Sequence, residues 1–201
     1  VLADAGLDKD IVALLPADRQ ATTELLQAVG FVDILIPRGS QNLIDFVRNN
    51  ARVPVIETGP GIVHTYFDKS GDVTKGAEII FNAKTRRVSV CNALDCLIIH
   101  ASRLADLPAL VSRLSEKSVS LYADERSLER LRPVYPADRL EPAEAHHYGT
   151  EFLDYKMSIR TVDSFEEALE HIHTHSSKHR EAIVADDEKT IEGFLLSLAA
   201  A

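Results

Sequence analysis

Short apolar runs alternate with amphipathic stretches in the first part of this chain, and this alternation constrains the fold more than any other feature. Three apolar runs have the length and composition of strands: 11–15, 31–36 and 53–56. Between them, residues 18–27 and 41–49 place apolar side chains at helical spacing, and Asp18 can cap the first helix. Strands that alternate with helices across short loops are typical of a parallel sheet with crossover connections. The sequence therefore predicts an α/β fold.

The same alternation resumes after a break at Gly59-Pro60-Gly61. We expect strands at 62–67, 89–99 (after an initial turn), 154–162 and 181–185. We expect helices at 72–84, 107–114, 165–173 and 187–198, with Asp72, Ser164 and Asp187 as caps. The proline-containing stretch 118–150 is expected to be irregular. The prediction is two units: a three-stranded half-sheet at 1–61, like the second half of a doubly wound domain, and an α/β unit at 62–201.

Composition and charge exclude several classes of protein. Hydrophobic residues make up 45% of the chain and charged residues 26%, which is typical of a globular protein. The net charge of −9 argues against a general nucleic-acid or anionic-membrane binder. No apolar run approaches the ~18 residues of a transmembrane helix. The chain starts at Val1, and its single methionine is Met157, so we expect a processed chain or a fragment, with no signal peptide in view.

The two cysteines are too few for a disulfide scaffold and do not have the spacing of a zinc motif. We expect both to be reduced. Cys91 follows the basic residues Lys84, Arg86 and Arg87, and nearby positive charge favours the nucleophilic thiolate form. Cys91 is therefore a candidate nucleophile, and a buried core cysteine is the common alternative. Cys96 lies within an apolar run and is expected to be structural.

Two predicted strand ends carry candidate ligand-binding residues. Glu57 ends the third predicted strand and is followed by Gly59 and Gly61, at the sheet edge where α/β proteins bind ligands. A helix cap or a turn residue is an equal alternative for Glu57. Arg38-Gly39-Ser40 follows a strand and opens a helix, where free backbone N–H groups suit a phosphate. A plain turn between strand and helix is the alternative there.

His171, His173 and His175 form an HxHxH run, a pattern that suggests a metal site. A helix does not place positions i, i+2 and i+4 on one face. No carboxylate or cysteine is placed along the sequence to complete a site. We therefore expect solvated histidines at a helix end, and no metal site.

Longer motifs occur in a fixed order along the chain: Glu57-Thr-Gly-Pro-Gly, His64, Asp68-Lys-Ser and Asn82-Ala-Lys-Thr-Arg-Arg-Val-Ser-Val-Cys-Asn-Ala. Together they resemble the gamma-glutamyl phosphate reductases (glutamate-5-semialdehyde dehydrogenases) of the aldehyde dehydrogenase superfamily. The resemblance continues through Ile36-Pro-Arg-Gly, Tyr148-Gly-Thr-Glu-Phe-Leu-Asp and His179-Arg-Glu-Ala-Ile-Val, so it covers nearly the whole chain. It implies an aldehyde dehydrogenase-like fold. Residues 1–61 would be the C-terminal half of a Rossmann-type cofactor-binding domain, and residues 62–201 the catalytic domain.

The resemblance also implies an activity, the second step of proline biosynthesis. This is the NADPH-dependent reduction of gamma-glutamyl phosphate to glutamate 5-semialdehyde and phosphate. Cys91 would attack the acyl phosphate to give a thioester, and its backbone N–H would hold the oxyanion. Glu57, the second catalytic candidate, matches the strand-end glutamate that is a general base in hydrolytic members. In this family phosphate replaces water in the reverse reaction.

Binding residues follow from the same resemblance. Three residues match the turn beside the cofactor phosphates: Arg38, Gly39 and Ser40. Glu151 matches the glutamate that contacts the nicotinamide ribose. Arg87, Asn92 and His179 would hold the substrate. The implied cofactor is NADP, and no metal is implied.

The chain also departs from the family. Val88 stands where the family usually has proline, and the family's chain is much longer. We therefore expect this fragment alone to be inactive. The full-length protein would be a cytoplasmic homo-oligomer, with glutamate kinase as a further partner. Two alternatives remain open: another aldehyde dehydrogenase acting on a different acyl substrate, and a non-catalytic α/β interaction domain in which Cys91 is buried.

Overall fold

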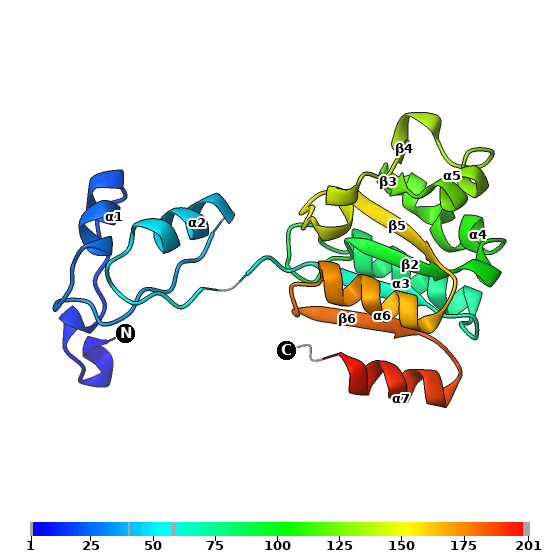
Figure 1. Ribbon diagram of the computed structural model, residues 1–201. Coiled ribbons are helices and arrows are strands. Elements are labelled where there is room, and N and C mark those ends of the chain that lie inside the picture. The colour runs from blue at the N-terminus through cyan, green and yellow to red at the C-terminus, as the bar shows by residue number, and fades with distance from the viewer. Residues whose placement is uncertain (1, 40, 58, 199–201) are drawn as a thin grey trace. The chain divides into compact units, whose positions relative to one another are not determined.

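The computed structural model describes residues 2–39, 41–57 and 59–198 (Figure 1). The chain divides into two compact units, Val1–Gly59 (unit 1) and Pro60–Ala201 (unit 2). Each unit has its own apolar core. Within the described ranges, no helix has both the length and the apolar character needed to span a bilayer.

Unit 1 contains the helices α1 (Arg19–Leu26) and α2 (Gln41–Asn50). Two short 3₁₀ turns, Ala3–Ala5 and Lys9–Ile11, precede them. Asp18 caps α1 as predicted, because its carboxylate accepts a hydrogen bond from Ala21 N at 2.6 Å. The core is small and is formed by the buried residues Leu26, Leu35, Val47 and Val53.

The three strands predicted for unit 1 are wrong. Residues 12–16 have no regular structure, and the other two runs retain only isolated parallel bridges, Val29↔Val32 and Leu35↔Val55. Leu35 N donates to Pro54 O at 2.8 Å, and Ile56 N donates to Leu35 O at 2.9 Å. A parallel pairing this short forms few hydrogen bonds. A strand is stable only where a neighbouring strand pairs with it along several residues.

Unit 2 is built on a six-stranded sheet in which every strand pair is parallel, in the order β4-β3-β5-β2-β1-β6. Its strands are β1 (Val63–Phe67), β2 (Cys96–His100), β3 (Ser120–Ala123), β4 (Leu140–Pro142), β5 (Lys156–Val162) and β6 (Arg180–Val184). The central strands β1 and β2 are buried almost throughout, which explains why they are apolar runs rather than alternating ones. The predicted α/β fold is confirmed.

Helices cover both faces of this sheet (Figure 1). The larger core packs α3 (Val73–Thr85), α4 (Leu107–Val111) and α5 (Glu125–Leu131) on one face. The smaller core packs α6 (Phe165–His175) and α7 (Glu188–Ser197) on the other. Short 3₁₀ segments lie in the connections of the unit, at Ala101–Arg103, Ser112–Lys117, Ala137–Arg139 and Ala145–Gly149.

The stretch 118–150, expected to be irregular, contains β3, α5 and β4. Asp124 begins α5, because its carboxylate accepts a hydrogen bond from Ser127 N at 2.9 Å. Pro142 ends β4, which lies at the edge of the sheet, where a residue without an N–H is tolerated. The prolines therefore mark the ends of short elements and not a loop.

Candidate active site

The predicted site residues of unit 2 gather at one edge of the sheet. Strands β5, β2, β1 and β6 are adjacent and parallel, so the segments that enter them meet at the amino edge. Glu151 precedes β5, Cys91 and Asn92 precede β2, and His179 immediately precedes β6. Ligands of open α/β sheets usually bind at the carboxyl edge. Here the turn that carries Cys91 (the cysteine turn) follows α3 and leads into β2. It therefore places the candidate catalytic residues at the amino edge instead.

Cys91 lies exposed in a turn between α3 and β2. Gly61 packs directly under it: a Cβ on Gly61 would lie 2.5 Å from Cys91 O and 2.6 Å from Cys91 Cβ. Only glycine fits this close approach. Gly61 N also donates to Glu151 Oε1 at 3.0 Å. Gly61 therefore connects the candidate nucleophile to the candidate cofactor-binding carboxylate, a role that its position in the sequence does not indicate.

The backbone of the cysteine turn leaves a donor free. Within the described part of unit 2, Cys91 N–H has no acceptor, whereas Ala93 N donates to Val90 O at 3.0 Å and Leu94 N to Ala83 O at 3.1 Å. A free N–H beside a thiol is suited to a negative charge that develops on a carbonyl oxygen. The role of this N–H as an oxyanion donor stays a prediction.

A buried ion pair supports this turn. Lys84 Nζ donates to Leu94 O at 2.9 Å and lies 3.9 Å from Asp95 Oδ1. The Asp95 carboxylate accepts hydrogen bonds from Val63 N at 3.3 Å and Phe152 N at 3.1 Å. Asp95 thus joins the entrances of β1, β2 and β5. Burial lowers the pKa of Lys84 and raises the pKa of Asp95, and each partner's opposite charge opposes these shifts.

Lys84 is not exposed beside Arg86 and Arg87. The sequence groups it with Arg86 and Arg87, but its ammonium group is fully buried against Asp95. Arg87 and Asn92 are exposed, and both line a hollow of about 220 Å³ together with Arg86 and Asn82. The two substrate-binding candidates therefore share one concave surface beside the cysteine turn.

His179 is half-buried, and its Nε2 atom has no hydrogen-bond partner in the part of the chain that the structure describes. The neighbouring loop is held to the β1 entrance, where Ile62 N donates to Ser177 Oγ at 2.9 Å. A buried imidazole nitrogen without a partner is unusual in a folded protein, and contact between His179 and a substrate stays a prediction.

Three candidate residues lie in the described part of unit 1: Arg38, Gly39 and Glu57. The Glu57 carboxylate contacts Arg48, with Oε1 3.3 Å from Nη1. Arg38 and Gly39 precede α2, whose first turn carries no acidic residue. Ser40 lies outside the described residues.

The cluster of histidines differs from the prediction. His173 is exposed as expected, but His171 and His175 are half-buried. The His171 ring packs edge-on against His64 and Tyr148, and burial lowers the pKa of His171 to about 3. The prediction of solvated histidines is therefore wrong for His171, because α6 turns this position toward the sheet.

The two cysteines should react at very different rates. Cys96 is fully buried, and desolvation raises the pKa of its thiol to about 12, whereas Cys91 is exposed. Because the thiolate is the reactive form, we expect iodoacetamide at pH 7 to alkylate Cys91 at least about a hundredfold faster. Tandem mass spectrometry of the shared tryptic peptide measures both rates. In urea the rates should converge, and equal rates in the folded chain would contradict this prediction.

Known proteins resemble this chain over nearly its whole length. No protein-family model matches it. Gamma-glutamyl phosphate reductase from Pelodictyon phaeoclathratiforme is 62% identical over 201 residues, which are 100% of this chain and 48% of that protein. The crystal structure of gamma-glutamyl phosphate reductase from Thermotoga maritima matches with a TM-score of 0.83 and 34% identity, over 93% of this chain and 44% of that one.

A more distant structure supports the fold alone. An acetylating aldehyde dehydrogenase from Geobacillus thermoglucosidasius has a TM-score of 0.70 at 20% identity, over 98% of this chain and 51% of that one. The predicted aldehyde dehydrogenase-like fold is therefore confirmed. The chain spans about half the length of the curated relatives that it matches.

Proposed function

Because this chain belongs to the gamma-glutamyl phosphate reductase family, we propose that it supplies the catalytic domain of such an enzyme, together with part of the cofactor-binding domain. The reaction is the reduction of gamma-glutamyl phosphate to glutamate 5-semialdehyde and phosphate, in proline biosynthesis. One observation supports this most strongly: the exposed Cys91 lies over Gly61, whose N–H binds the Glu151 carboxylate.

Cys91 begins the reaction as a thiolate. Its sulfur bonds to the acyl carbon, the bond from that carbon to the phosphate oxygen breaks, and inorganic phosphate leaves. The free N–H of Cys91 holds the negative charge on the carbonyl oxygen during this step. The sulfur later leaves as a thiolate when the acyl group has reached the aldehyde level. Arg87, Asn92 and His179 hold the substrate through its carboxylate or phosphate.

The residues present fit a nicotinamide cofactor. Arg38 and Gly39 precede α2, whose first turn has no acidic residue, so Arg38 and the backbone N–H groups of that turn would suit a phosphate. Glu151 uses Oε1 for Gly61 N and has a second oxygen for a ribose hydroxyl. NADPH, when bound, supplies the hydride. Glu57 matches by motif the strand-end glutamate of the superfamily, although only an isolated bridge, Leu35↔Val55, precedes it here. A base role is not needed, because phosphate replaces water in the reverse reaction.

The association and location of the full-length protein are also proposals. The substrate is a small molecule, as the relatives' name states. We propose a homo-oligomer in the cytoplasm, with glutamate kinase as the partner that makes the unstable acyl phosphate. Neither a nucleic acid nor a membrane is needed for the reaction.

Phosphate dependence tests this function. In a complete protein that contains this chain, glutamate 5-semialdehyde should reduce NADP only when inorganic phosphate is present, because phosphate releases the acyl group from Cys91. The absorbance of NADPH follows the reaction. The 201-residue chain alone should show almost no turnover, since it spans about half of its relatives. Turnover without phosphate would instead indicate a hydrolytic aldehyde dehydrogenase.

A further inference from the structure

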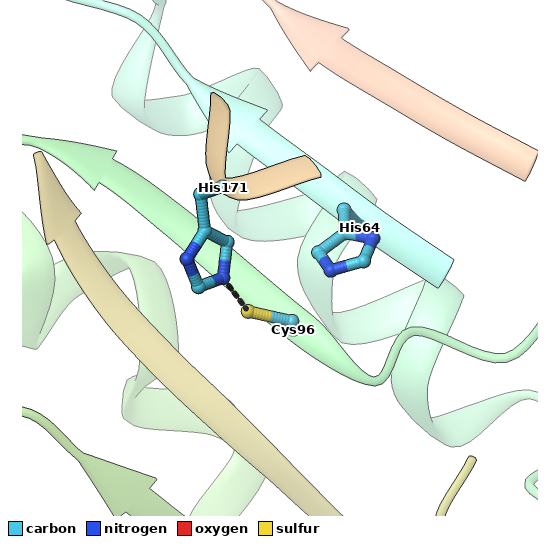
Figure 2. A group of neighbouring side chains, drawn as sticks. All are labelled: His64, Cys96 and His171. Carbon is cyan, nitrogen blue, oxygen red and sulfur yellow. Dashed lines mark hydrogen bonds between the residues drawn. The ribbon is translucent and has the colours of Figure 1, made fainter. Parts of the chain in front are cut away.

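Three nitrogen and sulfur ligands converge inside unit 2, away from Cys91. His64 comes from β1, Cys96 from β2 and His171 from α6, and their side chains point toward one another (Figure 2). One ligand atom of each residue lies within 4.8 Å of the other two. His64 and Cys96 are fully buried, and His171 is half-buried. The reductase reaction proposed above uses none of these residues.

The pairing of His64 shows which nitrogen is available. Its Nδ1 lies 3.1 Å from Glu181 Oε2, and both side chains are buried. In a neutral imidazole, a carboxylate partner at Nδ1 favours the tautomer with the proton on Nδ1, which leaves a lone pair on Nε2. His64 Nε2 is buried and has no hydrogen-bond partner among the described residues. Buried polar atoms without a partner are rare in folded proteins, and a bound cation would satisfy this lone pair.

Zinc accounts for these features. Cys96 Sγ and His171 Nε2 are 3.7 Å apart. Two tetrahedral zinc ligands with ordinary Zn–S and Zn–N bonds are separated by about 3.5 Å. Metal-bound histidines usually donate their other N–H to a carboxylate, as His64 donates to Glu181. Imidazole and thiolate donors select Zn²⁺ over Mg²⁺ or Ca²⁺.

The carboxylate of Glu181 is itself held in place. It accepts hydrogen bonds from His64 N at 3.1 Å and from the Ser176 hydroxyl. Because β6 pairs with β1 in register at His64↔Glu181, the sheet fixes this orientation. The His64 ring is therefore positioned before any ion binds, which lowers the entropic cost of binding.

A pocket of about 610 Å³ adjoins the cluster at His171, which lines it together with His175. The same pocket carries five carboxylates and two guanidinium groups: Asp124, Glu125, Asp163, Glu167, Glu170, Arg126 and Arg160. This excess of negative charge attracts a cation. We propose that His64 Nε2, Cys96 Sγ and His171 Nε2 form a Zn²⁺ site, with Glu181 orienting His64 and a water molecule as the fourth ligand.

Cobalt substitution tests the site on the reduced, chelator-treated 201-residue chain. The Cys91→Ser variant removes the exposed thiol from the measurement. One equivalent of Co²⁺ should then produce a thiolate-to-cobalt charge-transfer band, and one equivalent of Zn²⁺ should abolish it. Cys96→Ser should eliminate the band, and His171→Ala should weaken Co²⁺ binding at least about tenfold. Glu181→Gln should weaken it by about 10- to 100-fold, as for other residues that orient a ligand.

The matched control is His173→Ala, which removes an exposed histidine two positions from His171 on the same helix. It should bind Co²⁺ as the Cys91→Ser parent does. Far-UV circular dichroism identifies any variant that fails to fold. If Cys96→Ser does not fold, the Co²⁺ affinity of His171→Ala, which changes a half-buried position, tests the proposal instead. No charge-transfer band in the parent, or a band that survives in both ligand variants, would overturn the proposal. These readouts do not depend on reductase activity.

Discussion

For the proposed reaction, replacing Cys91 by serine in a complete protein that contains this chain should lower kcat/KM by roughly 10⁴- to 10⁶-fold, the range seen when other enzymes lose their nucleophile. A serine hydroxyl stays protonated at neutral pH, and an ester releases its acyl group less readily than a thioester. Steady-state measurement of NADPH oxidation gives the effect. Both kcat and kcat/KM should fall, because the missing bond forms in the transition state and not on substrate binding.

A neighbouring serine provides the control. Ser89 is exposed in the same turn, two residues before Cys91. Ser89→Ala should keep turnover close to that of the unmodified protein, because it changes the turn's composition without removing the thiol. A Cys91→Ser enzyme that retains more than about one hundredth of the original kcat would exclude Cys91 as the nucleophile.

Local signals in the sequence predict much of unit 2. Asp72, Ser164 and Asp187 each cap the helix expected of them, because a cap is made by the next few residues of the same segment. The apolar runs that form β1, β2, β5 and β6 are also predicted. Strand β3 is not, since it has only four residues and lies beside proline-containing segments.

The same kind of signal fails in unit 1. The run 11–15 is as apolar as a buried strand, yet Leu14 is 99% exposed. An apolar run becomes a strand only if another strand pairs with it, and partners cannot be identified from one segment alone. Hydrophobic periodicity therefore overestimates the regular structure there.

Some residues of the candidate site can be predicted from the sequence, but the contacts around them cannot. Cys91 and Glu151 stand out by motif. The contacts that organise their surroundings join residues far apart in sequence, such as Gly61 with Glu151 and Asp95 with Phe152. The cluster of His64, Cys96 and His171 also depends on sheet order and on the orientation of α6. Such groupings follow from tertiary structure, so no spacing rule could have shown them.

Replacing Lys84 by methionine should destabilise unit 2 by about 3–5 kcal/mol, the usual cost of removing one partner of a buried ion pair. Methionine keeps much of the side-chain volume but leaves the Asp95 carboxylate buried without its cation, and removes the donor to Leu94 O. Hydrogen exchange of the β2 amides measures the effect. These amides lie in the core of unit 2 and report its unfolding separately from unit 1.

The pH dependence identifies the cause of this loss. Burial already raises the pKa of Asp95 to about 6, and without Lys84 it should rise further, because the cation that lowers it is gone. Native Lys84→Met then binds a proton more tightly than its unfolded chain, so its free energy of unfolding increases as the pH falls. The deficit relative to the unmodified chain should therefore be largest near about pH 8 and shrink toward about pH 5.

The control is Lys75→Met, which removes an exposed lysine from the same helix, α3. It distinguishes the effect of losing a buried charge from the effect of losing any lysine there. Its side chain is 69% exposed, and its Nζ lies 3.7 Å from Asp186 Oδ1. Exposed pairs contribute about 0–1 kcal/mol, so Lys75→Met should change β2 exchange little at either pH. If Lys84→Met were no more destabilising than Lys75→Met, Asp95 could not be relying on Lys84 for compensation. The entrances of β1, β2 and β5 would then be held by the hydrogen bonds of Asp95 alone.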